Sequence, residues 1–382
     1  MNKIILIGGN HHNGLGLVRS FGVNGIKPLG IIIGNNKKNS FVTKSRYWEK
    51  TWVFSSEKEA ISFLLGNFKQ EIEKPVIIPW SDSAAAEIDN NLDALMPFFI
   101  VPSLGGIQGA IVKMMDKQRQ IEFMDKYGLP MATSWSISLP YKEDGEDFIY
   151  PCICKPVSSY EGLKTDIIKC NNSQELITYL SKIHKKGYKR ILVQEYIVFD
   201  RELVFDGSCG NDSGYIISQN VRNWPNVGGT NSFFQVINED KINTVCNQLL
   251  KALRNEKYFG MFDIELFQVK DRVLVNEINW RNSGNSFFSL GTNVHYAVIW
   301  YLNAIGVDTS MMKHHTNDTS QYAMNESTDL RHVIFGNLSI SNWFKDLKKT
   351  QSFALWYPKD LKPTFYQYLY LLKELVFHRH KG

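Results

Sequence analysis

The segment from residue 260 to residue 281 restricts the fold of this chain more than any other. Two runs of alternating apolar and polar residues, Gly260–Phe267 and Val273–Arg281, flank a charged turn at 270–272. Alternation with a period of two is typical of strands that bury one face, so the segment predicts an antiparallel strand pair. One face of the pair would be apolar, and the other would carry Asp263, Glu265, Glu277, Asn279 and Arg281.

The polar face of this pair has two interpretations. Carboxylate and amide oxygens are the hard ligands that Mg²⁺ prefers, with phosphate oxygens completing the octahedron. The Arg281 guanidinium, one alternation step beyond Asn279, suits a negatively charged group that is being transferred. Alternatively, the hairpin simply turns its charged side chains toward solvent. Strand alternation alone does not separate the two interpretations.

The first third of the chain predicts a parallel sheet. Short apolar runs rich in β-branched residues occur at Lys3–Gly8, Gly30–Gly34 and Val76–Pro79, and helical stretches such as Gly14–Phe21 separate them. Strands that alternate with helices in this way are typical of a doubly wound α/β domain with helices on both faces of the sheet.

Two features follow strands of this predicted sheet. The turn at residues 8–16 is rich in glycine but does not match the dinucleotide-binding pattern, so we expect an ordinary turn with His11 and His12 in a solvated loop. Asp82 comes directly after the strand at 76–79. This places Asp82 either at the ligand-binding carboxyl edge of the sheet or at the N-cap of a helix at 84–88.

The middle of the chain holds two lysines and a loop of small residues. A helix is predicted from Lys113 through Lys117 to a stop at Gly128. A buried strand at 149–156 then ends in Lys155, and the loop at 157–164 follows it. Backbone N–H groups and ammonium charges of such a loop can fold over phosphates.

Two further strands carry carboxylates that can face one pocket. An apolar strand at 191–197 is interrupted by Gln194 and Glu195, and a second strand starts at Asp200 and includes Glu202. A carboxylate at such a position suits the hydroxyls of a ribose, because it accepts two hydrogen bonds at once.

Taken in order, these segments resemble the ATP-grasp superfamily over roughly residues 1–310. The resemblance implies an α/β fold with a doubly wound pre-ATP-grasp domain at 1–111. It implies an ATP-grasp domain at 112–310, whose lid covers about 136–196 and whose last part is an antiparallel sheet. Residues 311–382 would form a basic, partly helical C-terminal extension.

The resemblance also implies roles for individual residues, with ATP and Mg²⁺ as cofactors and Mn²⁺ as an alternative metal. The residues that would bind the nucleotide are Lys117, Lys155, Ser158, Ser159, Lys164, Gln194, Glu195, Tyr196, Ile197 and Glu202. The metal ligands would be Glu265, Glu277 and Asn279, and the catalytic residues would be Arg281, Lys155 and Arg222. The lid loop departs from the usual pattern, since Gly162 is its single glycine.

Within the superfamily, the chain resembles D-aspartate ligase and related carboxylate–amine ligases of bacterial envelope and capsule synthesis. The segments that carry this resemblance are Ile7–Gly9, Gly14–Leu17 and Asn279–Gly284. In such ligases the stretch that holds Arg222 here binds the acid substrate, although a loop salt bridge is an equal alternative for Arg222.

This resemblance implies an ATP-dependent ligase that forms an amide through an acyl phosphate and releases ADP and phosphate. The acid would be an amino acid, and the acceptor an amine of a cell-envelope, polysaccharide or small-metabolite precursor. Two alternatives stay open. One is ATP-grasp chemistry of another kind, such as bicarbonate activation, and the other is a nucleotide-binding or scaffold protein without catalysis.

Composition narrows the class of protein further. The net charge of +5 is mild, and the aromatic residues are not interleaved with basic ones, so we expect no nucleic-acid partner. The five cysteines form no CxxC pair, which suits structural thiols in a reducing cytoplasm. No apolar run reaches the roughly 20 residues of a membrane span, and the N-terminus does not resemble a signal peptide.

The tail concentrates positive charge. Residues 345–382 contain eight Lys/Arg and three Asp/Glu, and 364–381 predicts an amphipathic helix. The helix would either dock peripherally on the anionic inner face of a membrane, cap the core, or contact a second copy of the chain. The segment 308–329, with His314 and His315, is expected to be a polar loop.

Overall fold

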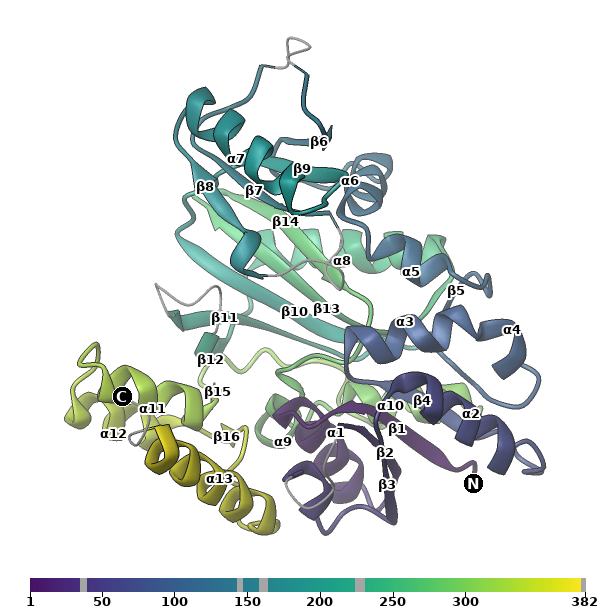
Figure 1. Ribbon diagram of the computed structural model, residues 1–382. Helices are drawn as coiled ribbons and strands as arrows, with labels where there is room; N and C mark the ends of the chain where they lie inside the picture. The colour runs from purple at the N-terminus through teal and green to yellow at the C-terminus, as the bar shows by residue number, and fades with distance from the viewer. Residues whose placement is uncertain (35–39, 143–146, 158–163, 224–230, 379–382) are drawn as a thin grey trace.

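The computed structural model describes residues 1–34, 40–142, 147–157, 164–223 and 231–378 (Figure 1). Within these residues the chain builds three sheets: a parallel one near the N-terminus, an antiparallel one in the lid, and a large mixed one between them and the C-terminal helices. Among the described residues, no helix combines the length and the apolar character that crossing a membrane requires.

The N-terminal domain is the predicted doubly wound α/β unit. Its four parallel strands are β1 (Ile4–Gly9), β2 (Leu29–Ile33), β3 (Lys50–Phe54) and β4 (Val76–Pro79), in the order β3-β2-β1-β4. Alternate strand residues pack against α1 (His12–Val23) on one face, and against α2 (Glu57–Asn67), α3 (Asp82–Asn90) and α4 (Leu92–Leu95) on the other. The short η1 (Val42–Lys44) lies beside α1.

Two local predictions in this domain were wrong. The N-cap of α3 is Ser81, whose Oγ accepts a hydrogen bond from the Ala84 amide at 3.3 Å, so Asp82 is already the first helical residue. The prediction of a solvated loop was wrong for His12, which begins α1, whereas His11 is exposed and lies before the helix, which it caps. In both cases the side chain just before the helix accepts a hydrogen bond from an orphan helical N–H.

The lid is a four-stranded antiparallel sheet covered by a helix. Its strands are β6 (Ser134–Ser138), β7 (Cys152–Pro156), β8 (Ile168–Cys170) and β9 (Arg190–Glu195), in the order β6-β9-β7-β8. One face packs on α7 (Ser173–Lys185), and η2 (Lys164–Asp166) precedes β8 (Figure 1). The strand predicted at 149–156 begins later than expected, at Cys152.

The central sheet places the polar residues singled out above. Its main path runs β14 (Arg272–Asn279), β13 (Tyr258–Val269), β10 (Arg201–Cys209), β11 (Tyr215–Asn223), β12 (Asn231–Val236), β15 (Tyr322–Met324), β16 (Ser352–Phe353), and β5 (Ser103–Leu104) pairs with β13. Its apolar face is buried under α8 (Asp240–Asn255) together with α5 (Ala110–Met114) and α6 (Lys117–Lys126).

The single helix predicted from Lys113 is in fact two helices. It is interrupted because Asp116 adopts an extended backbone conformation and its carboxylate caps α6, accepting from the Gln118 amide at 2.8 Å. This break makes Lys117 the first residue of α6.

The C-terminal part adds helices and two short strands. Its helices are η3 (Ser286–Phe288), α9 (Ser289–Thr292), α10 (Tyr296–Ala304), α11 (Glu326–Ile334), α12 (Ile340–Lys349) and α13 (Lys362–His378). The polar loop predicted at 308–329 was wrong at its end, since β15 and the start of α11 lie within it. β15 pairs with β12, and this long-range pairing makes a strand of only three residues.

Candidate active site

The polar face predicted for the 260–281 segment is present. β13 and β14 pair antiparallel, with Glu265 opposite Glu277 and Asp263 opposite Asn279. Directly opposed residues of an antiparallel pair point to the same side, so these four side chains share one face. A bulge after Glu265 leaves Asn276 without a partner in the ladder, and the Asn276 amide donates to Glu265 Oε2 at 3.1 Å.

Two lysines from other elements meet this face. Lys117 starts α6, its amide donates to the Val157 carbonyl of the lid at 2.9 Å, and its Nζ lies 2.6 Å from Glu277 Oε1. Lys155 is the next-to-last residue of β7 and is 8% exposed. Burial and then the nearby Lys117 charge lower the pKa of Lys155, Glu277 and Glu265 counteract them, and the net pKa is about 8. The two lysines and the two glutamates therefore form one cluster.

Burial and nearby negative charge both disfavour the ionised form of Glu265. Burial and then the charges of Glu277, Asp263 and Glu202 raise the pKa of Glu265 to about 8. A divalent cation between facing carboxylates would remove this repulsion. The Asn279 amide nitrogen donates to the Asp263 carbonyl at 3.2 Å, which leaves the amide oxygen as the group that Asn279 can offer. Two carboxylates and an amide oxygen fit the ligand chemistry of Mg²⁺.

Arg281 links this face to the N-terminal domain. Its Nε lies 3.2 Å from Asp82 Oδ1 at the start of α3, and its Nη1 is paired with Asp263. Burial opposes the charge, but Asp82 and Asp263 together raise the pKa of Arg281 above its ordinary value. The guanidinium is therefore held in a fixed orientation at the carboxyl edge of the parallel sheet, beside the predicted metal ligands.

The predicted ribose carboxylate belongs to the same side of the sheet. Glu202 on β10 is opposite Phe267, two residues beyond Glu265, and Asn231 donates to its Oε1 at 3.2 Å. Because residues two apart on a strand share a face, Glu202 and Glu265 point to the same side.

The segment predicted to meet the nucleotide base connects the lid sheet to the central sheet. Gln194 is buried and donates to Ser134 Oγ at 2.8 Å, while the amides of Glu195 and Tyr196 donate to backbone carbonyls of Thr133 and Pro151. Lys169 Nζ lies 4.2 Å from the centroid of the Tyr196 ring. Ile197, just past the end of β9, is partly exposed.

Three of the predicted lid-loop groups are not described. Ser158, Ser159 and the side chain of Lys164 lie outside the described residues, as do Gly162 and the segment 224–230 that follows Arg222. Their predicted contacts with phosphate or acid remain predictions.

Arg222 is engaged elsewhere. On β11, its Nη1 lies 2.6 Å from Asp329 Oδ2, and its Nη2 is paired with Asp346 of α12. The guanidinium also stacks over Phe233, with 5.0 Å to the ring centroid. The contacts of Arg222 in the structure are thus with the C-terminal part of the chain, as in the salt-bridge interpretation, and not with the lysine–glutamate cluster.

Several residues of the site escaped the sequence interpretation. Asp206 lies opposite Asp263 on β10 and is 1% exposed. Burial raises the pKa of Asp206 well above its usual value and the Asp263 charge adds to this, while Ser283, Arg281 and Asn285 act in the opposite direction. The period-two pattern that includes Glu202 could have revealed Asp206, since it lies four residues further along the same strand.

Gln120 was also missed, and it holds β14 in place. It is buried on α6, where its side chain both accepts from the Ile278 amide and donates to the Ile278 carbonyl, each at 2.9 Å. This bidentate contact fixes the strand that carries Glu277 and Asn279 against the helix that carries Lys117. No local pattern marks a glutamine that bonds a strand 158 residues away.

Histidines border the site at the N-terminal domain. One edge of His11 remains in solvent, yet enclosure by the surrounding protein, followed by the Arg281 charge, lowers its pKa to about 4. His295, predicted to be a core residue or a residue next to the site, is buried at the start of α10, where its Nδ1 lies 2.9 Å from Ser20 Oγ. Burial lowers the pKa of His295 to about 4 as well, so both imidazoles are neutral near pH 7.

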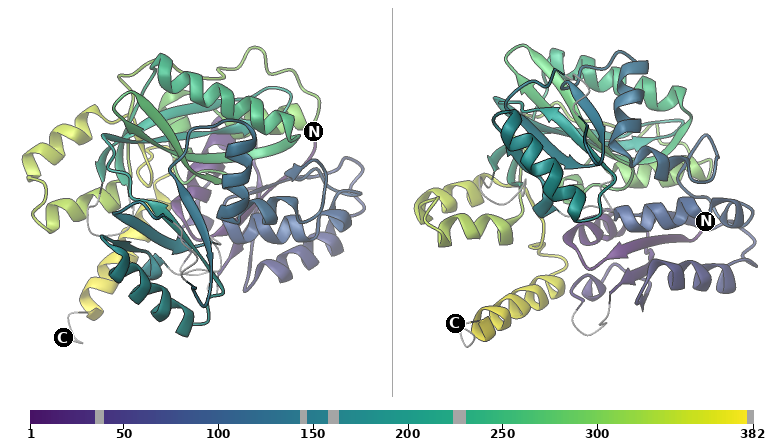
Figure 2. Two further views of the ribbon diagram at one scale, coloured as in Figure 1. Left: turned by 90° about the horizontal axis from the view of Figure 1, so that it is seen from above. Right: turned by 45° about the horizontal axis from the view of Figure 1, so that its top comes forward.

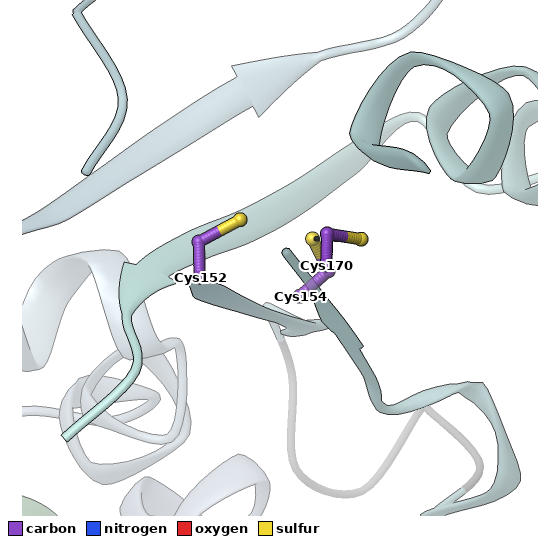
Figure 3. Close-up of side chains that lie close together, drawn as sticks. All are labelled: Cys152, Cys154 and Cys170. Carbon is purple, nitrogen blue, oxygen red and sulfur yellow. Dashed lines mark hydrogen bonds between the residues drawn. The ribbon is translucent and has the colours of Figure 1, made fainter. Parts of the chain in front are cut away.

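A second cluster of titratable groups lies in the lid core. Figure 3 shows Cys152 and Cys154 on β7 beside Cys170 on β8, with sulfur atoms that all lie within 4.8 Å of one another. Burial raises the pKa of Cys152 to about 11 and also raises those of Cys154 and Cys170. The neighbours are apolar residues of α7 and β9, so these thiols pack as small hydrophobic side chains.

The comparisons with known proteins agree with this architecture. Residues 122–292 match the family model described as "ATP-grasp domain". The formate-dependent phosphoribosylglycinamide formyltransferase of Vibrio cholerae is 24% identical over 218 residues, which are 50% of this chain and 54% of that protein. The corresponding protein of Sulfolobus acidocaldarius is 22% identical over 225 residues, with 53% and 56% covered. The chain thus spans about half the length of the curated relatives it matches.

Solved structures extend the similarity beyond the matched domain. N5-carboxyaminoimidazole synthetase from Staphylococcus aureus in complex with ADP superposes with a TM-score of 0.63 at 16% identity, covering 82% of this chain and 79% of that one. L-amino acid ligase from Bacillus licheniformis gives a TM-score of 0.60 at 15% identity, with 81% and 76% covered. The fold is therefore the α/β fold of the ATP-grasp superfamily. The part of the chain that matches the ATP-grasp domain model, residues 122–292, lies at the centre of this fold.

Proposed function

We propose that the chain is an ATP-dependent ligase that activates a carboxylate as an acyl phosphate and joins it to an amine. One observation carries the proposal: Glu265 and Glu277 oppose each other on the central sheet, with Lys117 and Lys155 beside them and Arg281 on the same strand pair. This arrangement collects oxygen donors and cations where a triphosphate and a transferring phosphoryl group need them.

The proposed role of each residue follows from the charge of its side chain. Glu265, Glu277 and Asn279 would hold Mg²⁺, which neutralises phosphate oxygens. Lys155 has a pKa lowered to about 8 by burial, and an approaching phosphate would restore its full positive charge. Lys117 would neutralise the same phosphates. The Arg281 guanidinium, oriented by Asp82 and Asp263, would stabilise the acyl phosphate and the tetrahedral species that forms when the amine attacks.

The reaction needs no nucleophilic side chain. A carboxylate oxygen of the acid attacks the γ-phosphorus of ATP, and ADP leaves. The amine then attacks the carbonyl carbon of the mixed anhydride, the carbon–oxygen bond to phosphate breaks, and the amine loses a proton. The task of the protein is to position the reactants and to exclude water from the anhydride.

An amino acid is the proposed acid substrate. The sequence resemblance to D-aspartate ligase and the fold similarity to an L-amino acid ligase support it. A second candidate is bicarbonate, because a structure with a similar fold, the biotin carboxylase domain of Hydrogenobacter thermophilus 2-oxoglutarate carboxylase, is a complex with MgADP and bicarbonate at a TM-score of 0.63. D-aspartate ligase chemistry, the acceptor amine and a cytoplasmic location remain part of the proposal.

A screen of ADP release tests the proposal. Amino acids are supplied singly and in pairs, and formate and bicarbonate are supplied with and without an amine. We expect release that requires both an acid and an amine, and a fall of roughly a thousandfold in Glu277→Ala, because a metal ligand is lost. Glu57→Ala on α2 is the control and should retain full activity.

Two outcomes would redirect the proposal. Formation of AMP and pyrophosphate would rule out an acyl phosphate, and bicarbonate-dependent ADP release without an amino acid would favour the second candidate.

A further inference from the structure

Exposed aromatic side chains gather at one end of the molecule. In the described part of the chain, every large aromatic side chain that is exposed lies between residues 335 and 370. These side chains are Phe335, Phe344, Trp356, Phe365, Tyr366 and Tyr370. Exposed Ile334, Ile340, Leu369 and Leu372 accompany them. Single exposed apolar residues are ordinary, but a concentration of this kind marks an interaction surface.

The helices that carry these residues lie on the outside of the molecule. α11, α12 and α13 occupy the same end, away from the lid (Figures 1 and 2). α12 has no buried residue. On α13, Thr364 faces inward, while Phe365, Leu369 and Leu372 are 60%, 56% and 58% exposed. Positions that recur after four and then three residues share one side of a helix, so α13 presents an apolar stripe to its surroundings.

The carboxylates of this region are held inside the protein. Asp360 is 3% exposed and lies 3.0 Å from Arg19 Nε, and Asp329 is fully buried against Arg222. Asp346 pairs with Arg222 and with Lys349, and Glu326 accepts from the Leu355 amide at 3.0 Å. These four are all the Asp and Glu residues between 326 and 373. None of them therefore offers a free negative charge to the outside.

The basic residues of the same region are turned outward. The exposed ones are Arg331, Lys345, Lys348, Lys349, Lys359, Lys362 and Lys373. Lys349 pairs with Asp346, while the other six have no ion pair among the described residues. The surface therefore combines aromatic and aliphatic side chains with ammonium and guanidinium groups that no carboxylate of the region compensates. We call the exposed side chains of residues 331–373 the C-terminal surface.

We infer that the C-terminal surface docks on an anionic lipid bilayer. Phenylalanine, leucine and isoleucine side chains can enter the acyl boundary, tyrosine and tryptophan suit the headgroup level, and lysines pair with anionic headgroups. A two-fold dimer would place this positive surface against its own copy, which like-charge repulsion opposes. Nucleic-acid bases could stack on the aromatic side chains but would leave Ile334, Ile340, Leu369 and Leu372 exposed, because aliphatic side chains have no flat face for stacking. The inference does not depend on the proposed reaction.

Vesicle flotation of the full chain tests the inference. Vesicles of phosphatidylcholine are compared with vesicles that contain one part phosphatidylglycerol to two parts phosphatidylcholine. We expect the bound fraction to be at least about tenfold higher on the anionic vesicles, and to fall at high salt because headgroup attraction is screened. Equal flotation with both kinds of vesicle would overturn the inference.

Two pairs of substitutions separate the apolar and the charged contributions. Phe365→Ser with Leu369→Ser removes part of the stripe, and Lys345→Glu with Lys348→Glu reverses charge on α12. Each pair should lower binding to anionic vesicles about tenfold at an unchanged melting temperature. The first pair should also lower residual binding in high salt, whereas the second should remove the salt dependence.

Matched controls lie outside the C-terminal surface. Ile72→Ser and Met311→Ser change side chains that are 98% and 96% exposed, and Lys58→Glu with Lys251→Glu reverses two exposed charges on α2 and α8. These variants should bind like the original chain. If they lose binding equally, the effect is not specific to this surface and the inference fails. It also fails if light scattering shows a dimer that the Phe365/Leu369 pair splits while vesicle binding is unchanged.

Discussion

The lysine–glutamate cluster of the central sheet is partly buried and the thiol cluster of the lid is fully buried, and the neighbours of the two clusters differ. In both clusters burial raises the pKa values of acidic groups. Around Glu265, however, the neighbours are Glu277, Lys155 and Lys117, charged groups from three separate elements. Around Cys154 the neighbours are apolar side chains and two further thiols.

The difference is the reason that we propose the first cluster, and not the second, as the functional site. The glutamates repel each other at a place that remains partly open to solvent, so they gain from a cation and from phosphates that bring it. The thiols are shielded from water and contact apolar side chains, which disfavours a thiolate, so they remain protonated and unreactive. The predictions below test this contrast.

The largest expected effect belongs to the guanidinium of the first cluster. Arg281→Lys keeps a positive charge but loses the planar fork that bridges Asp82 and Asp263. We expect the rate of ADP release at saturating ATP to fall about a hundredfold, with a smaller change in the KM for ATP. Steady-state kinetics of the acid-dependent reaction measure both quantities, and an unchanged rate would remove Arg281 from the catalytic residues.

Arg222 tests whether a buried ion pair can be purely structural. Arg222→Met leaves the fully buried Asp329 without its cation, so we expect a loss of about 3 kcal/mol in unfolding free energy. Chemical denaturation measures this loss. The role in acid binding that the sequence suggested requires a higher KM for the acid in a variant at this position. If stability falls and that KM does not change, Arg222 is a structural residue only.

Glu265 links the pH dependence of stability to metal binding. Its pKa is raised from 4.5 to about 8, so the folded state keeps a proton that the unfolded state releases between these values. The contribution of this proton to the free energy of unfolding is complete below about pH 4.5 and is lost as the pH rises through about 8. Without divalent cations, melting temperature should therefore fall by several degrees across this window.

Two comparisons check the origin of this fall. Mg²⁺ should reduce the fall, because it binds the ionised form, and Glu265→Gln should remove most of it. A melting curve for Glu265→Gln with the same pH dependence as the original chain would contradict the assignment.

The smallest expected effect belongs to the thiol cluster. Cys154→Ala removes one buried sulfur and should cost about 1 kcal/mol of stability without changing ADP release. In the original chain, the lid thiols should react with a thiol reagent only on the timescale of unfolding, because burial raises their pKa values. Rapid labelling at pH 7, or a loss of activity in Cys154→Ala, would show that the two clusters are more alike than we describe.

The sequence predicts local features of this molecule well. The alternation in 260–281 produced both the hairpin and its polar face, because strand periodicity depends only on neighbouring residues. The parallel sheet followed from the β-branched runs in the same way. The helix break at Asp116 was missed because the apolar spacing continues across it while the side-chain cap does not show in that spacing.

Contacts between distant segments were beyond local patterns. The Arg281–Asp82 pair joins two domains, and the three lid thiols meet because β7 and β8 pair side by side. β15 and β16 contain three and two residues, too few for any periodicity to appear. The convergence of Lys117 and Lys155 on the glutamates was available only through resemblance to a family, since their helix and strand reveal nothing about each other.

Oxygen transfer tests the central claim most directly. The amino acid that gives the greatest ADP release in the screen is prepared with ¹⁸O in its carboxylate, and the released phosphate is analysed by mass spectrometry. An acyl phosphate carries one carboxylate oxygen to phosphate when the amine displaces it, so the account predicts phosphate with a single ¹⁸O and a yield equal to that of amide. Phosphate without label, or label in AMP, would contradict the account.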